Sequence, residues 1–79
     1  MKQVLTDIAR AIVEHPELVV VTESDEGDTT ILQLMVSADD MGKVIGKRGK
    51  IANAIRTVVK ATASRDNKRV IVNIVSDAE

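Results

Sequence analysis

Cysteine, phenylalanine, tyrosine and tryptophan are all absent from this chain of 79 residues, and proline and histidine occur once each. Without cysteine there are no disulfides, no thiolate nucleophiles and no Cys-ligated metal sites. Without aromatic rings there is no platform of the kind on which many proteins stack nucleobases. No apolar run approaches membrane-span length, and Asp7 and Arg10 interrupt the segment where a signal peptide would be apolar. We therefore expect a cytoplasmic protein with no membrane partner and no redox chemistry.

A single folded domain over residues 1–79 fits what is present, because hydrophobic residues make up 44% of the chain and charged residues 29%. No group of side chains indicates an enzyme. His15 precedes a proline and has no evident partner, so a surface or capping role is expected. The adjacent Asp39 and Asp40 are expected to cap a helix rather than to act as acid and base. The sequence thus predicts no catalytic residue, no cofactor and no metal site.

Charge is distributed very unevenly along the chain. Residues 1–40 contain nine acids and two cations, a net charge of −7, whereas residues 41–79 contain nine cations and three acids, a net charge of +6. Six of those cations lie in residues 41–62, which contain no acid. An asymmetry of this kind indicates a surface that binds a polyanion, although a solvated helix face is an equally ordinary reading of the pattern alone.

Hydrophobic spacing predicts an α+β domain with the order αββααβ. Apolar residues recur every three to four positions before Pro16 and again after Gly49, as on one face of a helix. Two β-rich runs flank a polar turn that contains Gly27, which predicts a hairpin. Two helices then connect the second strand to the third, a crossover that joins parallel neighbours. We expect a three-stranded mixed sheet with all three helices on one face, built from residues 4–13, 18–22, 30–37, 41–45, 51–62 and 70–75.

Between the two middle helices, residues 46–49 form a GxxG loop with Lys47 and Arg48 at its variable positions. Glycines at both corners permit a tight turn and let a sugar-phosphate backbone approach the main-chain N–H groups. The helix that follows presents unpaired N–H groups at its first turn, which also favours a phosphate. A GxxG loop between two helices is typical of KH domains, which bind RNA. A P-loop is excluded because the residues from Gly42 to Lys47 do not match GxxxxGK.

Beside this loop, Ile45, Ile51, Val44 and Ile55 are expected to wall an apolar groove for nucleobases. The predicted function is binding of single-stranded RNA, about four nucleotides per domain. The residues expected to contact it are Gly42, Lys43, Val44, Ile45, Gly46, Lys47, Arg48, Gly49, Lys50, Ile51 and Arg56. Three alternatives stay open: a plain glycine-turned helical hairpin, a protein-interaction module whose partner contacts the RNA, and a DNA-binding helical hairpin.

The run GKVIGKRGKIANAIRTVV, residues 42–59, resembles the KhpA family of small bacterial KH-domain proteins, and the likeness extends over nearly the whole chain. The resemblance implies a single type II KH domain in a cytoplasmic RNA-binding protein that forms homodimers. It also implies pairing with a larger KH-domain protein, KhpB (also called Jag or EloR). A role as a post-transcriptional regulator or RNA chaperone in control of cell shape and of cell-wall and envelope growth is implied in the same way.

More apolar side chains are present than one face of a small core requires, which suggests a self-association surface. On the sheet, Ile31, Met35, Ile71 and Val75 are expected to point outward. The resemblance favours contacts near the GxxG loop instead, with Ile55, Val58 and Val59 as the dimer interface. RNA and a second copy would then compete for one surface.

Overall fold

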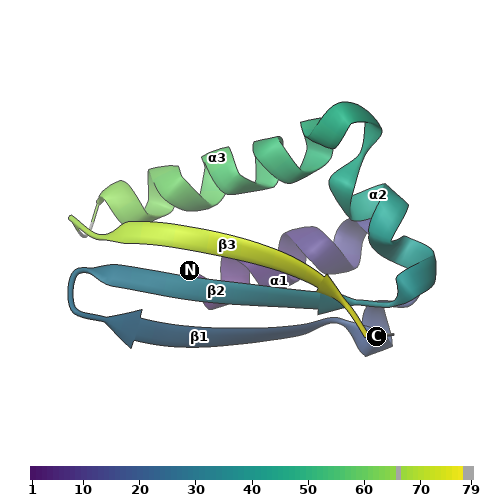
Figure 1. The fold of residues 1–79 in the computed structure, drawn as a ribbon, viewed down its shortest axis with the longest axis horizontal. Coiled ribbons are helices and arrows are strands. Elements are labelled where there is room, and N and C mark those ends of the chain that lie inside the picture. The colour runs from purple at the N-terminus through teal and green to yellow at the C-terminus, as the bar shows by residue number, and fades with distance from the viewer. Residues whose placement is uncertain (66, 78–79) are drawn as a thin grey trace.

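The computed structural model describes residues 1–65 and 67–77, and the elements follow the expected order (Figure 1). Three α-helices and three strands are joined by short connections, among them single 3₁₀ turns at Pro16–Leu18, Ala38–Asp40 and Lys47–Gly49. The elements are α1 (Lys2–Ile12), β1 (Val20–Glu26), β2 (Thr29–Val36), α2 (Met41–Ile45), α3 (Lys50–Ser64) and β3 (Arg69–Ser76).

The boundaries of β1 differ from the prediction at both ends, and the strand continues to Glu26, four residues beyond its predicted end. Strand β1 begins at Val20, two residues later than expected, because Pro16 opens a 3₁₀ turn instead of leading straight into a strand. In that turn the Leu18 N–H donates to the His15 carbonyl (3.0 Å) and the Val19 N–H to the Pro16 carbonyl (3.2 Å). The fixed φ of proline suits the first position of such a turn.

The sheet has the order β1-β2-β3, so the prediction of a central second strand is confirmed (Figure 1). β1 and β2 pair antiparallel, from Val20 opposite Met35 to Glu26 opposite Thr29. The two-residue turn between them has Gly27 at φ 68°, the glycine position of a type II′ hairpin. β2 and β3 pair parallel, and the α2–α3 connection supplies the crossover.

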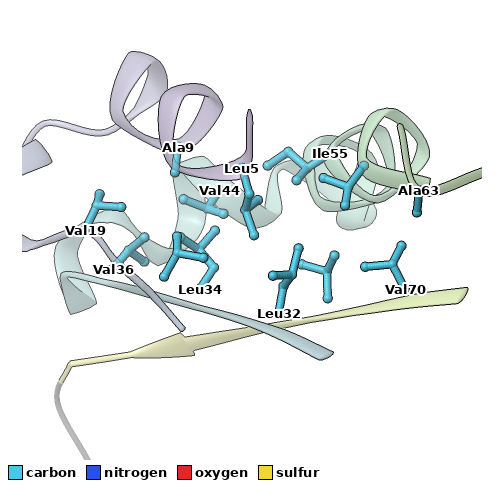
Figure 2. Packing of buried hydrophobic residues seen from close by; sticks show 13 residues of the cluster. Leu5, Ala9, Val19, Leu32, Leu34, Val36, Val44, Ile55, Ala63 and Val70 are labelled. Carbon is cyan, nitrogen blue, oxygen red and sulfur yellow. The ribbon is translucent and has the colours of Figure 1, made fainter. Parts of the chain in front are cut away.

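A single layer of aliphatic side chains separates the helices from the sheet (Figure 2). Leu32, Leu34 and Val36 of the central strand are fully buried beneath the helices. Alanines such as Ala9 and Ala63 occupy buried helix positions and let the helices approach closely. Each buried leucine or valine contributes about 1.5 to 3 kcal/mol relative to leaving it in water. The apolar core is therefore aliphatic throughout.

Asp40 is fully buried and connects two parts of the chain that are far apart in sequence. Its two carboxylate oxygens accept hydrogen bonds from the backbone N–H groups of Glu14 and His15, both at 3.0 Å. The prediction that Asp39 or Asp40 caps α2 is wrong, because neither side chain forms a cap bond there. The Ser37 hydroxyl instead accepts from the Asp39 N–H (3.3 Å) at the preceding turn. The Asp40 carboxylate therefore accepts from the two N–H groups that follow α1 and not from the first N–H groups of α2.

A second carboxylate, Asp25, lies on the helix side of β1 near the hairpin. Its Oδ1 accepts a hydrogen bond from the buried Thr30 hydroxyl (2.8 Å), and the Lys68 ammonium lies 3.6 Å away. The Thr30 hydrogen bond and, second, the charge of Lys68 hold the pKa of Asp25 below its ordinary value of 3.8. These contacts connect β1, β2 and the segment that enters β3.

Replacing Asp40 is expected to destabilise the fold more than replacing its exposed neighbour. In Asp40→Asn one of the two N–H groups, both part-buried, loses its acceptor at the fully buried residue 40, at a cost of about 2 kcal/mol. Asp39→Asn, at a side chain that is 84% exposed, should change stability by less than about 0.5 kcal/mol. Urea unfolding followed by far-UV circular dichroism compares the two. Equal losses in both variants would show that the Asp40 hydrogen bonds add nothing.

Asp25 is expected to make stability depend on pH at the acid end. Its folded pKa lies below 3.8, so its contribution is present above that value and is lost as the pH falls through the lowered pKa. The stability difference between wild type and Asp25→Asn should therefore shrink between about pH 5 and about pH 2. Thermal melts at several pH values measure this, with Glu26→Gln as the control on the same hairpin. A difference that does not change with pH would contradict the assignment.

Candidate nucleic-acid interface

The GxxG loop between α2 and α3 has a backbone that requires glycine at Gly46. This residue has φ 73° and ψ 177°, a region open to glycine and essentially closed to other residues. A Cβ at this position would lie 2.6 Å from Cγ1 of Ile51. Gly46 N–H donates to the Gly42 carbonyl (2.9 Å), which ends α2. The first isoleucine of α3 thus packs directly against the corner of the loop.

The next two loop corners are left-handed as well. Arg48 has φ 57° and Gly49 has φ 75°, and the Gly49 N–H donates to the Gly46 carbonyl at 3.2 Å. An arginine with positive φ is uncommon and is held at a cost of about 1 kcal/mol or more. Backbone strain of this kind is typical of functional loops, whose backbone and side chains are held in one conformation. Here it turns the backbone sharply into α3 and leaves the Lys47 and Arg48 side chains exposed.

Lys47, Arg48 and Lys50, which we call the loop cations, surround the N-terminus of α3. All three are exposed, and none of them forms an ion pair with another residue in the described part of the chain. No side chain caps the 15-residue helix α3, so its first N–H groups and its dipole add to this positive potential. Lys43 differs from its neighbours because its Nζ lies 3.5 Å from Glu14 Oε1. The predicted loop cations are therefore together and available, whereas the charge of Lys43 is partly compensated.

Helix α3 has two different flanks on either side of its buried face. The flank toward β3 is basic: Arg56 donates from Nε to the Val72 carbonyl (3.3 Å) and bridges the helix and the strand. Farther along the same flank lies an open hollow of about 610 Å³. It is lined by Thr29, Lys60, Ser64, Asn67, Lys68, Arg69, Val70 and Ile71. α3 and β3 run side by side from the loop to this hollow (Figure 1), and the cations Arg56, Lys60, Lys68 and Arg69 lie along them.

The outer edge of β3 borders this basic flank. The Arg69 N–H donates to the Asp28 carbonyl, and the Asp77 N–H donates to the Val36 carbonyl. The N–H and C=O groups of every second residue from Arg69 onward therefore point toward β2. The N–H and C=O groups of Val70, Val72 and Ile74 then face the other edge, which no described strand covers. The Val72 carbonyl on this edge is the one that Arg56 reaches.

The opposite flank of α3 borders α1 and is apolar. An open groove of about 360 Å³ runs here between the two helices. Val58 is 47% exposed and Ile51 39% exposed, both high for aliphatic side chains. The groove is lined by Ile8, Ile12, Lys50, Ile51, Ala54, Ile55 and Val58. Of the four residues expected to wall an aliphatic groove, Ile51 and Ile55 line this one, whereas Val44 and Ile45 do not. The groove lies on the flank away from the hollow beside Lys60, and Lys50 lies at its margin.

Three predicted site residues are in the core. Val44 and Val59 are fully buried and Ile55 is 3% exposed, so the prediction that these three side chains lie at the surface is wrong. Ile55 still lines the apolar groove between α1 and α3. Helical spacing alone does not show which of two adjacent apolar positions faces the sheet. Ile45 and Val58, by contrast, are exposed. The contact residues predicted from the sequence do not include Lys60, Lys68 and Arg69, which line the hollow. The one indication of them in the sequence was the positive net charge of residues 41–79.

Other kinds of site have no counterpart in residues 1–65 and 67–77. No group of three or more His, Cys, Asp or Glu side chains in these residues is placed to hold a metal ion. No helix in the same residues has the length and apolar character needed to cross a membrane.

Comparison with known proteins places this geometry in a family. A family model described as KhpA/KhpB, KH domain, matches residues 2–74. RNA-binding protein KhpA of Clostridium acetobutylicum is 53% identical over 75 residues, which cover 95% of this chain and 100% of that protein. The protein of the same name from Listeria monocytogenes is 41% identical over 95% of this chain and 99% of that protein.

The fold is also similar to part of a larger solved chain. That chain comes from the crystal structure of Era in complex with MgGDPNP and nucleotides 1506-1542 of 16S ribosomal RNA, with a TM-score of 0.67 over 95% of this chain and 29% of that chain. At 13% identity this likeness concerns the fold alone. The family model and the close relatives cover almost the whole sequence, and the chain therefore belongs to the KhpA/KhpB family of KH-domain proteins.

Proposed function

We propose that the chain binds single-stranded RNA, with a phosphate at the GxxG loop and the following nucleotides along the basic flank of α3. The observation that carries this function is the group of unpaired loop cations at the uncapped N-terminus of α3. Backbone N–H groups, helix dipole and side-chain charge all favour an anion at this point. Close relatives are named RNA-binding proteins, which supports the same function for this chain.

The length of the basic flank suits a short RNA segment. Lys50 and Lys60 are separated by ten positions on α3, or about 15 Å at 1.5 Å per residue. A KH domain clamps about four nucleotides. The hollow beside Lys60, Lys68 and Arg69 then lies where the far end of such a segment would run. Phosphates along this path meet cations from both α3 and β3.

Bases are expected to be held without aromatic stacking, because the chain has no aromatic residue. Arg56 is half-buried, and its bond to the Val72 carbonyl holds the planar guanidinium beside the β3 edge. A guanidinium plane is a surface on which a base can stack. The open N–H and C=O groups of the β3 edge offer hydrogen bonds to base edges. Preference among bases would then be modest, since few side chains contribute.

We also propose that the chain forms homodimers through the apolar flank of α3. Ile51, Ala54 and Val58 follow one another at spacings of three and four residues, which gives one apolar stripe along the helix. Packing of this stripe on its copy would cover side chains that water now reaches. Because the basic flank lies on the other side of the buried face of α3, RNA and a second copy would contact mostly different residues, and Lys50, which lines the groove, is the loop cation that both would reach.

A larger KH-domain protein of the KhpB type is the second partner that we propose for this stripe. The family model describes one kind of KH domain for both KhpA and KhpB, so two such domains would present related helices to each other. Two linked RNA sites bind more tightly than one. We place the chain in post-transcriptional regulation or RNA chaperoning in the cytoplasm, with cell shape and envelope growth as the process affected.

The alternative function is a protein-interaction module in which only the partner contacts RNA. The exposed apolar groove between α1 and α3 is the observation that favours it. It predicts tight protein association together with negligible RNA affinity of the isolated chain. Measurement of RNA binding by the chain alone separates the two functions.

Charge reversal in the loop is expected to remove RNA binding without unfolding the domain. Lys47→Asp with Arg48→Asp places two acids beside the phosphate site, and aspartate tolerates the left-handed backbone of Arg48. Affinity for a labelled single-stranded RNA pool, measured by fluorescence anisotropy, should fall by more than about tenfold. For wild type, log affinity should fall with log salt at a slope near about −2 if about three phosphates are neutralised.

The matched control reverses two cations outside the site. Lys2→Asp with Arg10→Asp changes the net charge by the same amount on α1 and should leave RNA affinity nearly unchanged at moderate salt. Equal losses in both variants would indicate a general charge effect and would contradict the loop site. No RNA binding by wild type would favour the protein-interaction module.

Dimerisation is expected to be lost in Val58→Lys. The side chain at this position is 47% exposed and lies in the apolar groove, so a lysine there would place a charge in the proposed interface. Thr57→Lys, at an exposed position outside the groove, adds the same charge and should still dimerise. Sedimentation equilibrium with interference optics gives the mass of each protein, since the chain has no aromatic absorbance. Two monomeric or two dimeric variants would count against this interface.

A further inference from the structure

The two cations of the acidic first half, Lys2 and Arg10, line the same hollow. Residues 1–40 contain no other lysine or arginine, and both of these side chains project from α1 over the start of β1. The hollow has a volume of about 510 Å³ and lies between helix and strand. Its lining consists of Lys2, Gln3, Thr6, Arg10 and residues 19–21. No acid is among the lining residues, although acids outnumber cations nine to two in this half.

The floor of this hollow includes a strand edge with unused hydrogen-bonding groups. β1 is an edge strand of the sheet. In a two-residue hairpin the residues that flank the turn, here Glu26 and Thr29, are a hydrogen-bonded pair, so even-numbered residues of β1 face β2. The N–H and C=O of Val21 therefore face outward beneath α1. No described strand covers this side of β1.

Charge divides the β1 edge into two halves. Toward the hairpin, Glu23, Asp25 and Glu26 are exposed and discourage another strand from pairing there. Residues 19–21, at the other end, are three valines without a charge, and this is the half that the hollow contains. The edge is thus protected where it is acidic. Beneath the cations, Val21 offers its N–H and C=O to a partner, whereas the Val19 N–H already donates to the Pro16 carbonyl (3.2 Å).

We propose that an extended acidic peptide segment of a partner protein binds here, adding a strand to β1 at residues 19–21 beneath Lys2 and Arg10. Main-chain hydrogen bonds to a strand edge supply affinity, and side-chain sites beside the edge supply selectivity. Lys2 and Arg10 are eight positions apart on α1, or about 12 Å. An extended chain covers this distance in about four residues. The segment that fits best has acidic side chains four positions apart, with small apolar residues between them.

A second copy of the chain fits this edge less well. A two-fold axis through paired β1 strands would bring the Lys2 and Arg10 flank of one α1 toward the same flank of the other, which is repulsive. RNA also fits less well, because a phosphate backbone has no N–H groups to pair with a strand edge and the surrounding half of the chain carries −7. The acid of α1, Asp7, accepts a hydrogen bond from the Gln3 side-chain amide (2.7 Å) and is not among the residues that line the hollow.

The test uses a short fluorescein-labelled peptide of valine and threonine with two glutamates four positions apart, at low salt. Fluorescence polarisation should show weak, saturable binding, and the nitrogen-15 NMR spectrum of the whole chain should shift at residues 19–21 and along α1. The same peptide with N-methylated backbone keeps the charge and loses the strand hydrogen bonds, and it should not bind. Lys2→Glu with Arg10→Glu should weaken binding by about tenfold, whereas Lys60→Glu should not.

Four other results would contradict the proposed peptide site on β1. Equal binding of the N-methylated peptide would mean that charge alone acts, and shifts confined to α3 would place the peptide elsewhere. Shifts at residues 19–21 that depend on protein concentration without peptide would identify a second copy as the occupant. Shifts there on addition of a single-stranded RNA, but not of the peptide, would identify RNA. Because Lys2 and Arg10 lie outside the proposed RNA site, failure here leaves that function unaffected.

Discussion

One layer of aliphatic side chains holds three helices against three strands, and every other feature of the domain depends on it. Without aromatic rings the layer is thin, and buried alanines at Ala9, Ala52 and Ala63 let the helices lie close to the sheet. Contacts outside this layer also fix the positions of the helices. The buried Asp40 carboxylate and the contact of Ile51 with Gly46 are two such contacts.

The position of α3 organises the surface into regions with different chemistry. Its buried face packs on the sheet, its β3 flank is basic, and its α1 flank is apolar. The basic and the apolar flanks are separate, but Lys50, one of the loop cations, also lines the apolar groove, so whether RNA and a second copy compete stays a question for experiment. Four of the nine acids in residues 1–40, Glu23, Asp25, Glu26 and Asp28, lie at or beside the turn between β1 and β2.

Most of the fold could be predicted from the sequence because hydrophobic period and turn residues act locally. The helix at Met41–Ile45, the hairpin at Gly27 and the crossover all follow from such signals. Long-range contacts could not be predicted in this way. Nothing near Asp40 indicates that its carboxylate accepts from Glu14 and His15, since the three residues meet only in the folded chain.

In the candidate site, too, local features could be predicted from the sequence and long-range contacts could not. The loop cations were predicted correctly as neighbours at a helix start, because four consecutive turn residues determine that geometry. Lys60, Lys68 and Arg69 come together only when β3 is laid beside α3, so no spacing in the sequence indicates them. Ile55 and Val58 are three residues apart on one helix, yet one faces the core and the other faces solvent.

The parallel pairing of β2 with β3 also affects when, during synthesis and folding, the proposed RNA-binding surface is complete. β3 is the last of the strands to leave the ribosome, and it can join the sheet only after the α2–α3 crossover has been made. Parallel pairing across such a crossover is slow compared with hairpin formation. During synthesis, the chain would therefore form its loop and α3 before β3 completes the basic flank. The RNA path proposed along this flank would be complete only after β3 has joined the sheet.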